Sequence, residues 1–267
     1  MTEQPSAPVT RWGWLRRWLR GWRGWVVFLV IFALFCTALG IWLAKAFEPA
    51  PDPWSEYPGV GGTPMADILD DDSVERIGER FEEVAADIRT SITAEFGFDW
   101  VQHGEPELRD RTNRFGGTSM LQQYRGPAWQ TLGTLRDIDD KQRLLELVAP
   151  IIEAHGFGTP ELRNTMGPDA VPEYGDFLLE DQGRWVLSAR PPETTRGELR
   201  VTILDLARDR TGGLAAGSAD DIASRGYERE YVSIMFVGDL MLREADREEF
   251  ERRSLRYEGH LPPAPSF

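Results

Sequence analysis

The side chains best suited to chemistry are few and scattered. The histidines are His103, His155 and His260, and none belongs to an HExxH motif or to a close pair. The spacing of a zinc site is therefore missing. His155 follows an expected helix, where the helix dipole favours a cation and an ordinary C-cap is the interpretation. No serine stands in a GxSxG motif. The sequence predicts no catalytic residue, no metal and no cofactor.

Acidic residues are abundant but form no recognisable motif. The run Asp70-Asp71-Asp72 lacks the alternating oxygen ligands, the central glycine and the distal glutamate of an EF-hand loop. Helix capping and solvation explain it. A pair of carboxylates could still form a hydrolase site, because such a pair is defined by its separation in space, which a sequence does not report. An envelope hydrolase therefore stays open as an alternative function.

Cys36 is the only cysteine of the chain. Within the chain it has no second thiol for a disulfide or a metal site. The residue before it is Phe35, whereas a bacterial lipoprotein signal has a small residue there. We interpret Cys36 as an apolar residue of a helix.

That helix is predicted over Trp25–Ala44, a run of twenty residues without a charged side chain. At about 1.5 Å per residue it matches a hydrocarbon core of roughly 30 Å. Five arginines precede the run and one lysine follows it, so the positive-inside rule places the N-terminus in the cytoplasm and the C-terminal part outside the plasma membrane. The alternative is a secretory signal cleaved after Ala46, although its apolar region would be unusually long.

Residues 1–24 form a basic segment rich in tryptophan and arginine. One interpretation is a helix that lies along anionic lipid head groups, and the other is an ordinary positive flank with an aromatic belt. Both make the lipid bilayer a partner. The predicted membrane-interface residues are Arg16, Arg17, Arg20, Arg23, Trp18, Trp22, Trp25 and Trp42.

Charge separates this segment from the rest of the chain. Residues 1–45 carry a net charge of +5 and the remaining residues carry −19. An acidic body repels phosphate backbones, so nucleic acid is excluded as a partner.

Composition divides the chain after the helix into three parts. Residues 45–64 are rich in proline and glycine and are predicted to be a linker. Residues 65–255 are predicted to be a single extracytoplasmic α+β domain, with amphipathic helices packed on an antiparallel sheet. Residues 256–267 are expected to be an irregular tail.

Hydrophobic periodicity locates three helices in this domain. The first is expected over Ser73–Phe96, with Asp72 as its N-cap and Gly97 as its end. The second covers Asp139–His155 and contains Pro150, which should kink it. A charged helix is expected within residues 242–255.

Alternating or continuous apolar runs locate the strands. Residues 98–104 and 118–125 are expected to be extended, and residues 230–238 to form a central strand. A hairpin is predicted over Phe177–Arg190, with its turn at residues 181–183. Residues 198–208 are another strand, and Thr211–Asp220 is expected to be flexible.

The order of these elements resembles the LppA-like lipoproteins of actinobacterial envelopes over about residues 65–240. The residues that carry the resemblance are Trp129 and the segment Leu147–Phe157. The chain departs from those proteins at its anchor, because they begin with a lipidated cysteine. The resemblance implies an envelope location, and no functional residue carries over.

These features predict a single-pass, membrane-anchored protein that acts as a non-catalytic binding or interaction module. Its expected partner is an envelope protein or a cell-wall component. Small residues along the helix, such as Ala33, Ala38 and Gly40, also leave open a subunit role within a membrane complex.

Overall fold

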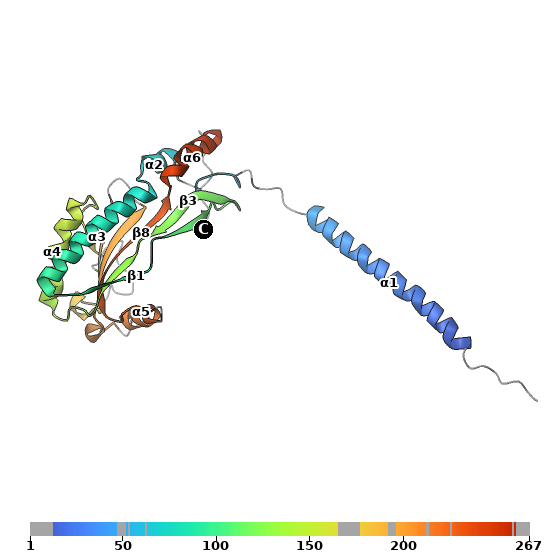
Figure 1. Ribbon diagram of the computed structural model, residues 1–267, viewed down its shortest axis with the longest axis horizontal. Helices are drawn as coiled ribbons and strands as arrows, with labels where there is room; N and C mark the ends of the chain where they lie inside the picture. The colour runs from blue at the N-terminus through green and yellow to red at the C-terminus, as the bar shows by residue number, and fades with distance from the viewer. Residues whose placement is uncertain are drawn as a thin grey trace, which may run out of the picture. The chain divides into compact units, whose positions relative to one another are not determined.

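The computed structural model divides the chain into two units, drawn as ribbons in Figure 1. The first unit ends at Pro51 and the second begins at Asp52. The structure describes residues 13–46, 52, 54–61, 63–164, 177–191, 196–211, 214–224, 226–257 and 259.

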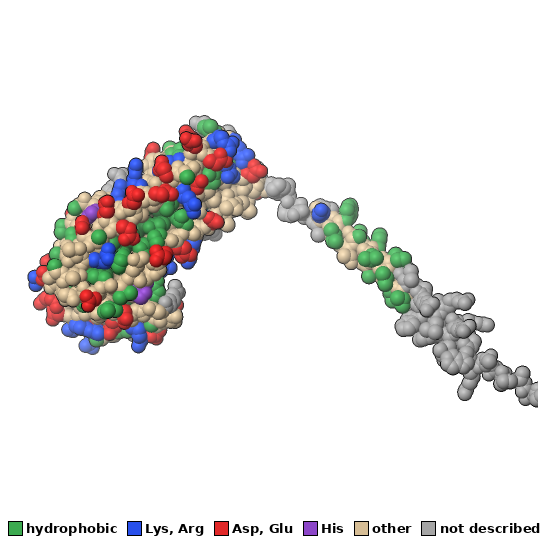
Figure 2. Space-filling view, viewed as in Figure 1, with side chains coloured by type: hydrophobic (Ala, Val, Ile, Leu, Met, Phe, Trp, Pro, Cys, Tyr) green, Lys and Arg blue, Asp and Glu red, His purple; other side chains and the backbone are tan. Residues whose placement is uncertain are grey.

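The first unit contains one described helix, α1, Gly13–Ala46, which includes the whole of the apolar run Trp25–Ala44. Figure 2 shows apolar side chains along its described part, and those from Phe28 to Phe35 are exposed. Among the described residues, none of the helices combines the length and the apolar character that a membrane crossing requires. The membrane span therefore stays a prediction.

In the second unit, the described strands form one eight-stranded sheet in the order β1-β4-β8-β7-β6-β5, with β2 and β3 beside it. Each of the paired strands is antiparallel to its neighbour. The longest strand, β8, pairs with β7 on one side and with β3 and β4 on the other. The strands are β1 Trp100–His103, β2 Glu107–Thr112, β3 Thr118–Arg125, β4 Ala128–Thr131, β5 Glu161–Leu162, β6 Arg184–Ala189, β7 Gly197–Leu204 and β8 Tyr231–Met241.

Two long helices lie side by side against one face of this sheet, as Figure 1 shows for α3 and α4. The predicted α+β class is confirmed. The helices of this unit are α2 Met65–Asp70, α3 Val74–Phe96, α4 Ile138–Ala154, α5 Leu214–Ala223 and α6 Arg247–Ser254. Short 3-10 turns are η2 Leu179–Asp181, η3 Leu206–Arg208, η4 Glu244–Asp246 and η5 Leu255–Tyr257.

The main core lies between these two helices and the sheet. The apolar stripe of α3 is fully buried at Ile77, Phe81 and Ile88, and it meets alternate residues of the central strands. A strand turns successive side chains to opposite faces, so Leu199 and Val201 both point toward the helices. The face that carries the core is thereby fixed by the pattern of β7.

The ends of α3 follow local hydrogen-bonding chemistry. Its N-cap is Ser73 and not Asp72, because the Ser73 hydroxyl accepts from the backbone N–H of Arg76. Gly97 ends the helix with φ of 71°, as predicted, because glycine adopts this left-handed conformation without strain.

Two predicted elements are wrong. Phe177–Arg190 does not form a hairpin: its first part contains the turn η2, and its second part, β6, pairs with β5 and β7. Thr211–Asp220 is not a flexible loop throughout, because most of it belongs to α5. Both predictions relied on local glycines: Gln182-Gly183 suggested a hairpin turn, and Gly212-Gly213 suggested a flexible loop.

The predicted linker is also wrong in its second half. Residues 54–61, called the strap here, belong to the folded body, and Tyr57 and Val60 are 1% and 3% exposed. The Tyr257 ring packs edge-on against Tyr57 at a centroid distance of 5.1 Å. The folded body therefore begins at Asp52 and includes Tyr257, which the sequence placed in an irregular tail. Residues 260–267 of that tail lie outside the described residues.

Asn113 holds the strap in place. Its fully buried side-chain amide donates to the carbonyl oxygens of Ser55 at 2.7 Å and Tyr57 at 3.0 Å. The side-chain oxygen of Asn113 accepts from the backbone N–H of Gly117 at 3.0 Å. A Cβ at Gly117 would overlap the carbonyl oxygen of Ser55, so only glycine allows the strap to approach this closely.

Replacing Tyr57 with alanine tests whether the strap is part of the fold. Because Tyr57→Ala empties a buried aromatic site, we expect it to lower the free energy of unfolding by about 3–5 kcal/mol. Chemical denaturation followed by circular dichroism measures this difference.

The control variant is Leu132→Ala, at a side chain that is 55% exposed. Its effect should stay within about 0.5 kcal/mol. An equally small effect of Tyr57→Ala would mean that the strap is a solvated linker after all.

Candidate functional site

The histidines lie in separate parts of the folded body. His155 is the C-cap residue of α4, as predicted, and its Nε2 lies 2.8 Å from a carboxylate oxygen of Asp87 on α3. The His103 ring on β1 stacks on Tyr227 at a centroid distance of 4.4 Å. His260 lies outside the described residues. No group of three or more His, Cys, Asp or Glu side chains in the described ranges could hold a metal ion.

Two aspartates of the acidic run before α3 form ion pairs with arginines. Asp72 forms ion pairs with Arg76 and Arg80, at 3.3 and 2.8 Å, and Asp71 pairs with Arg196. These aspartates therefore join α2, α3 and the start of β7.

Two of the predicted membrane-interface side chains belong to the described part of α1. Trp25 and Trp42 are described, and both are about two-thirds exposed, at 65% and 64%. The side chains of Arg16, Arg17, Arg20, Arg23, Trp18 and Trp22 lie outside the described residues. Their role at a membrane stays a prediction.

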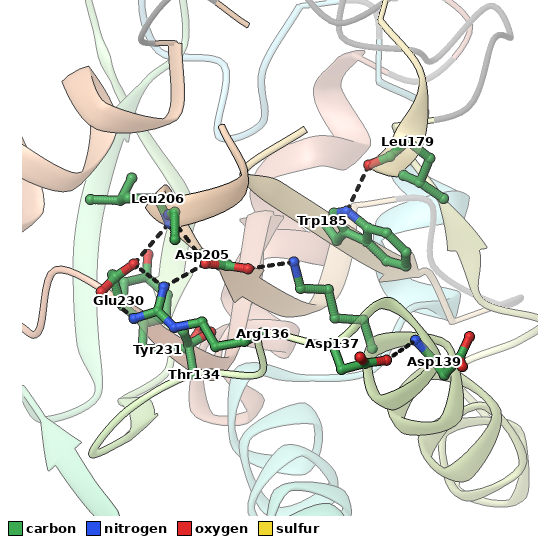
Figure 3. A network of polar contacts seen from close by, with 12 residues as sticks. Thr134, Arg136, Asp137, Asp139, Leu179, Trp185, Asp205, Leu206, Glu230 and Tyr231 are labelled. Carbon is green, nitrogen blue, oxygen red and sulfur yellow. Dashed lines mark hydrogen bonds and ion pairs between the residues drawn. The ribbon is translucent and has the colours of Figure 1, made fainter. Parts of the chain in front are cut away.

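A buried ionic network, shown in Figure 3, centres on Asp205 at the end of β7. Lys141 Nζ on α4 donates to one of its oxygens at 2.8 Å, and Arg136 donates to the other at 2.5 Å. Arg136 also forms a two-pronged contact with Glu230, at 2.5 and 2.7 Å. The side chains of Lys141 and Asp205 are 1% and 0% exposed.

This network holds elements of the fold together. Asp205 also accepts from the backbone N–H of Ala207, and Glu230 accepts from that of Leu206. Each charge is thus matched and hydrogen-bonded, which is what a buried ion pair requires. None of the network residues lines the three cavities described among these residues. Its role is to join the start of α4 to the end of β7.

The opposite face of the sheet carries the candidate binding site. In β7, Arg200 and Thr202 alternate with the buried apolar residues and point away from α3 and α4. The strand register places Thr202 opposite Ser233, and Ser233 opposite Gln130. We call this second face the open face; its centre is a row of short polar side chains from β4, β8 and β7.

A cavity of about 120 Å³ lies on the open face. Arginines and tyrosines surround its polar row, and none of the described residues that line it is acidic. Burial raises the pKa of Tyr231, and nearby Arg184 acts in the opposite direction. The Tyr231 phenol therefore stays protonated at neutral pH and can donate a hydrogen bond. The lining residues are Arg125, Ala128, Gln130, Arg184, Arg200, Thr202, Tyr227, Tyr231, Ser233 and Met235.

Two buried polar atoms at this cavity have no hydrogen-bond partner among the described residues. Gln130 is 3% exposed, and its side-chain oxygen is unpartnered. The Nε of Arg200 is also buried and unpartnered. Leaving a buried polar atom unsatisfied costs about 1–3 kcal/mol, and such atoms in a native protein need an explanation. A ligand in the cavity would supply the missing partners.

A carboxylate next to the cavity positions Arg200. Glu198 accepts from Arg200, from Ser188 and, at 2.8 Å, from Arg163. Burial alone would raise the pKa of Glu198, but the hydrogen bonds from Arg200 and Ser188 lower it. Glu198 thus stays ionised and fixes the guanidinium of Arg200 beside the polar row.

The described cavities offer no pair of acids for hydrolysis. A second cavity of about 280 Å³ near the β5–β6 edge contains one acidic residue, Glu161, and a third beside the strap contains none. Two facing carboxylates would be needed. The carboxylate-pair hydrolase therefore gains no support from these cavities.

Sequence reasoning named none of the open-face residues. The signal was present in residues 197–204, where Glu198, Arg200 and Thr202 alternate with apolar residues. That alternation shows that a second face exists but does not show which strands meet there. Gln130 and Ser233 come from strands about 100 residues apart, and only the sheet order brings them together.

Comparisons with family models, with curated proteins and with solved structures find no match for this chain. The resemblance to LppA-like lipoproteins stays a prediction.

Lys141→Met tests the buried network. The change leaves the buried carboxylate of Asp205 without one of its two cations, so we expect the free energy of unfolding to fall by about 3–5 kcal/mol. Urea denaturation gives the value. Arg143→Met is the matched control on the same helix, because Arg143 is exposed and its pair with Glu95 should contribute no more than about 1 kcal/mol. Equal effects of both variants would contradict the structural role of Lys141.

Glu230 should make stability depend on pH. Hydrogen bonds from Arg136 lower its pKa; burial acts against them, and the backbone N–H of Leu206 adds to the lowering. A carboxyl group whose pKa is lower in the folded state stabilises the fold above its unfolded pKa and loses this contribution as pH falls through the folded value. Comparing the unfolding free energies of the parent and Glu230→Gln should show a difference that is constant near neutral pH and shrinks below about pH 4.

The exposed neighbour supplies the control for this titration. Glu228→Gln should change the free energy of unfolding by no more than about 0.5 kcal/mol. A Glu230→Gln difference that does not shrink in acid would contradict the ion pair with Arg136.

Proposed function

We propose that this protein is a membrane-anchored binding module of the bacterial cell envelope, and that the cavity on the open face holds its ligand. The anchor in this proposal is the apolar run Trp25–Ala44 of α1, with the basic residues 1–24 in the cytoplasm and the folded body outside. The apolar length of that run and the arginines before it support the anchor.

One observation carries the binding function. Gln130 is almost fully buried in the cavity floor, yet its side-chain oxygen has no hydrogen-bond partner among the described residues. Asn113 and Asp205, which hold the fold, are hydrogen-bonded, whereas His103 Nε2 and Ser254 Oγ are unpartnered within the described ranges like Gln130 but lie outside the lining of this cavity. An unsatisfied acceptor is a cost to the folded body that a ligand would remove.

The arrangement favours binding over catalysis. The cavity contains cations, hydroxyls and an amide, which orient a polar ligand. Among the described residues that line it there is no histidine, cysteine or carboxylate side chain, the groups that most often act as general base or nucleophile. The ligand in this proposal is a small polar group presented by an envelope or cell-wall component.

Photocrosslinking in intact cells tests this proposal. Met235 lines the cavity, so a diazirine amino acid in its place should form one reproducible adduct with an envelope component. The full-length protein should be found in the membrane fraction. The same amino acid in place of the exposed Leu132, outside the cavity, is the control.

The adduct should disappear when Gln130→Met is added to the crosslinking protein, because this change removes the unpartnered acceptor. Equal labelling from both positions would contradict a ligand in the cavity. A shorter species in the medium that begins after Ala46 would contradict the anchor.

A further inference from the structure

The cavity on the open face is basic within an acidic body. Arg200 is matched by Glu198. Neither Arg125 nor Arg184 has an ion pair within 4.0 Å of a described carboxylate. Glu107 lies opposite Arg125 across the β2–β3 pairing, but its own carboxylate is held by Arg109 at 2.8 Å. Two guanidinium groups are thus available to an anion.

The cavity floor requires more than an anion. The unpartnered oxygen of Gln130 is an acceptor, so an oxyanion placed against it alone would be repelled. Beside it, the hydroxyl groups of Ser233 and Thr202 are nearly buried and have no hydrogen bond to another described side chain or backbone group. A hydroxyl group can donate or accept. The floor therefore fits a ligand that carries a hydrogen-bond donor next to its charge.

We infer that the cavity binds a small oxyanion, a phosphate or a carboxylate, that carries a neighbouring hydroxyl group. The planar fork of arginine matches both kinds of anion. The volume of about 120 Å³ lies below the roughly 300–1,000 Å³ of pockets for drug-sized ligands, so it accommodates a head group. The inference rests on the proposed binding function and names the chemistry of its ligand.

Calorimetric titration of the full-length protein in a neutral detergent tests the inference. The probes are glycerol 3-phosphate, glycerate and glycerol, which share hydroxyl groups and differ in charge. We expect the two anions to bind and glycerol not to bind. The affinity for the anions should fall as salt is raised, because part of it is electrostatic.

Two variants separate the roles of charge and hydroxyl recognition. Arg184→Gln should weaken the binding of both anions by at least about tenfold, the effect of losing one hydrogen bond to a charged group. Gln130→Met should weaken glycerol 3-phosphate more than sulfate, which is an oxyanion without a donor. Arg143→Gln, at an exposed arginine on α4, should change neither affinity. Circular dichroism checks that each variant is folded.

The outcomes distinguish this inference from the function on which it rests. If neither anion binds, or if Arg184→Gln binds both as tightly as the parent, the oxyanion is the wrong ligand. A specific adduct at Met235 would then still support a binding cavity with a ligand of other chemistry. Loss of both results would overturn the inference and the proposed function together.

The same titration identifies the source of the head group. The protein is placed in nanodiscs of phosphatidylcholine, with or without phosphatidylglycerol, and glycerol 3-phosphate is added. A weaker apparent affinity in the discs that contain phosphatidylglycerol supports a lipid head group as the ligand. An unchanged affinity supports a free phosphate.

Discussion

The pairing of β8 with three neighbours is the constraint on which the folded body depends. A strand turns alternate side chains to opposite faces of the sheet. The register of β8 against β7 and β4 therefore determines which face each side chain of these three strands occupies. Ile234 and Phe236 enter the core beneath the helices, and Ser233 and Met235 enter the cavity on the other side. A shift of one residue would exchange the two sets. Burial of the apolar residues in the core therefore also puts the polar row on the opposite face, where it lines the cavity.

Some buried polar groups of the described body hold the fold, and others have no hydrogen-bond partner. Those that hold the fold are hydrogen-bonded: Asn113 donates to the strap, and Asp205 accepts from Lys141 and Arg136. Those at the cavity, the oxygen of Gln130 and the Nε of Arg200, are not. A folded protein is stable by only about 5–15 kcal/mol, so a loss of about 1–3 kcal/mol per unsatisfied group is appreciable. Atoms outside the lining of this cavity, such as His103 Nε2 and Ser254 Oγ, also have no partner within the described body. Gln130 and Arg200 stand out because they line a cavity together with further arginines and hydroxyl groups.

Periodicity predicted the elements well where a single face was apolar. The stripe of α3, the alternation of β7 and the continuous run of β8 all gave the right type of element. Prediction failed where tertiary contacts override local composition. The proline- and glycine-rich strap is buried because Asn113 hydrogen-bonds to it and the Tyr257 ring packs against it. The glycine-containing segment before β6 forms no hairpin because β6 pairs with β7. The site was beyond sequence reasoning because β4, β7 and β8 are far apart along the chain.

The acidic body gives the basic cavity a particular kind of selectivity. Residues 46–267 carry a net charge of −19, which opposes the approach of any anion at long range. Screening limits that opposition to about 8–10 Å at physiological salt. Once inside the cavity, an anion meets Arg125, Arg184 and Arg200, and the lining residues that the structure describes include no acid. Binding then draws on short-range contacts with these guanidinium groups and on a hydroxyl group of the ligand next to Gln130, and not on long-range attraction by the whole body. An anion without that partner gains the guanidinium contacts but leaves the oxygen of Gln130 unsatisfied. Among anions, such a site selects those that carry a neighbouring hydrogen-bond donor.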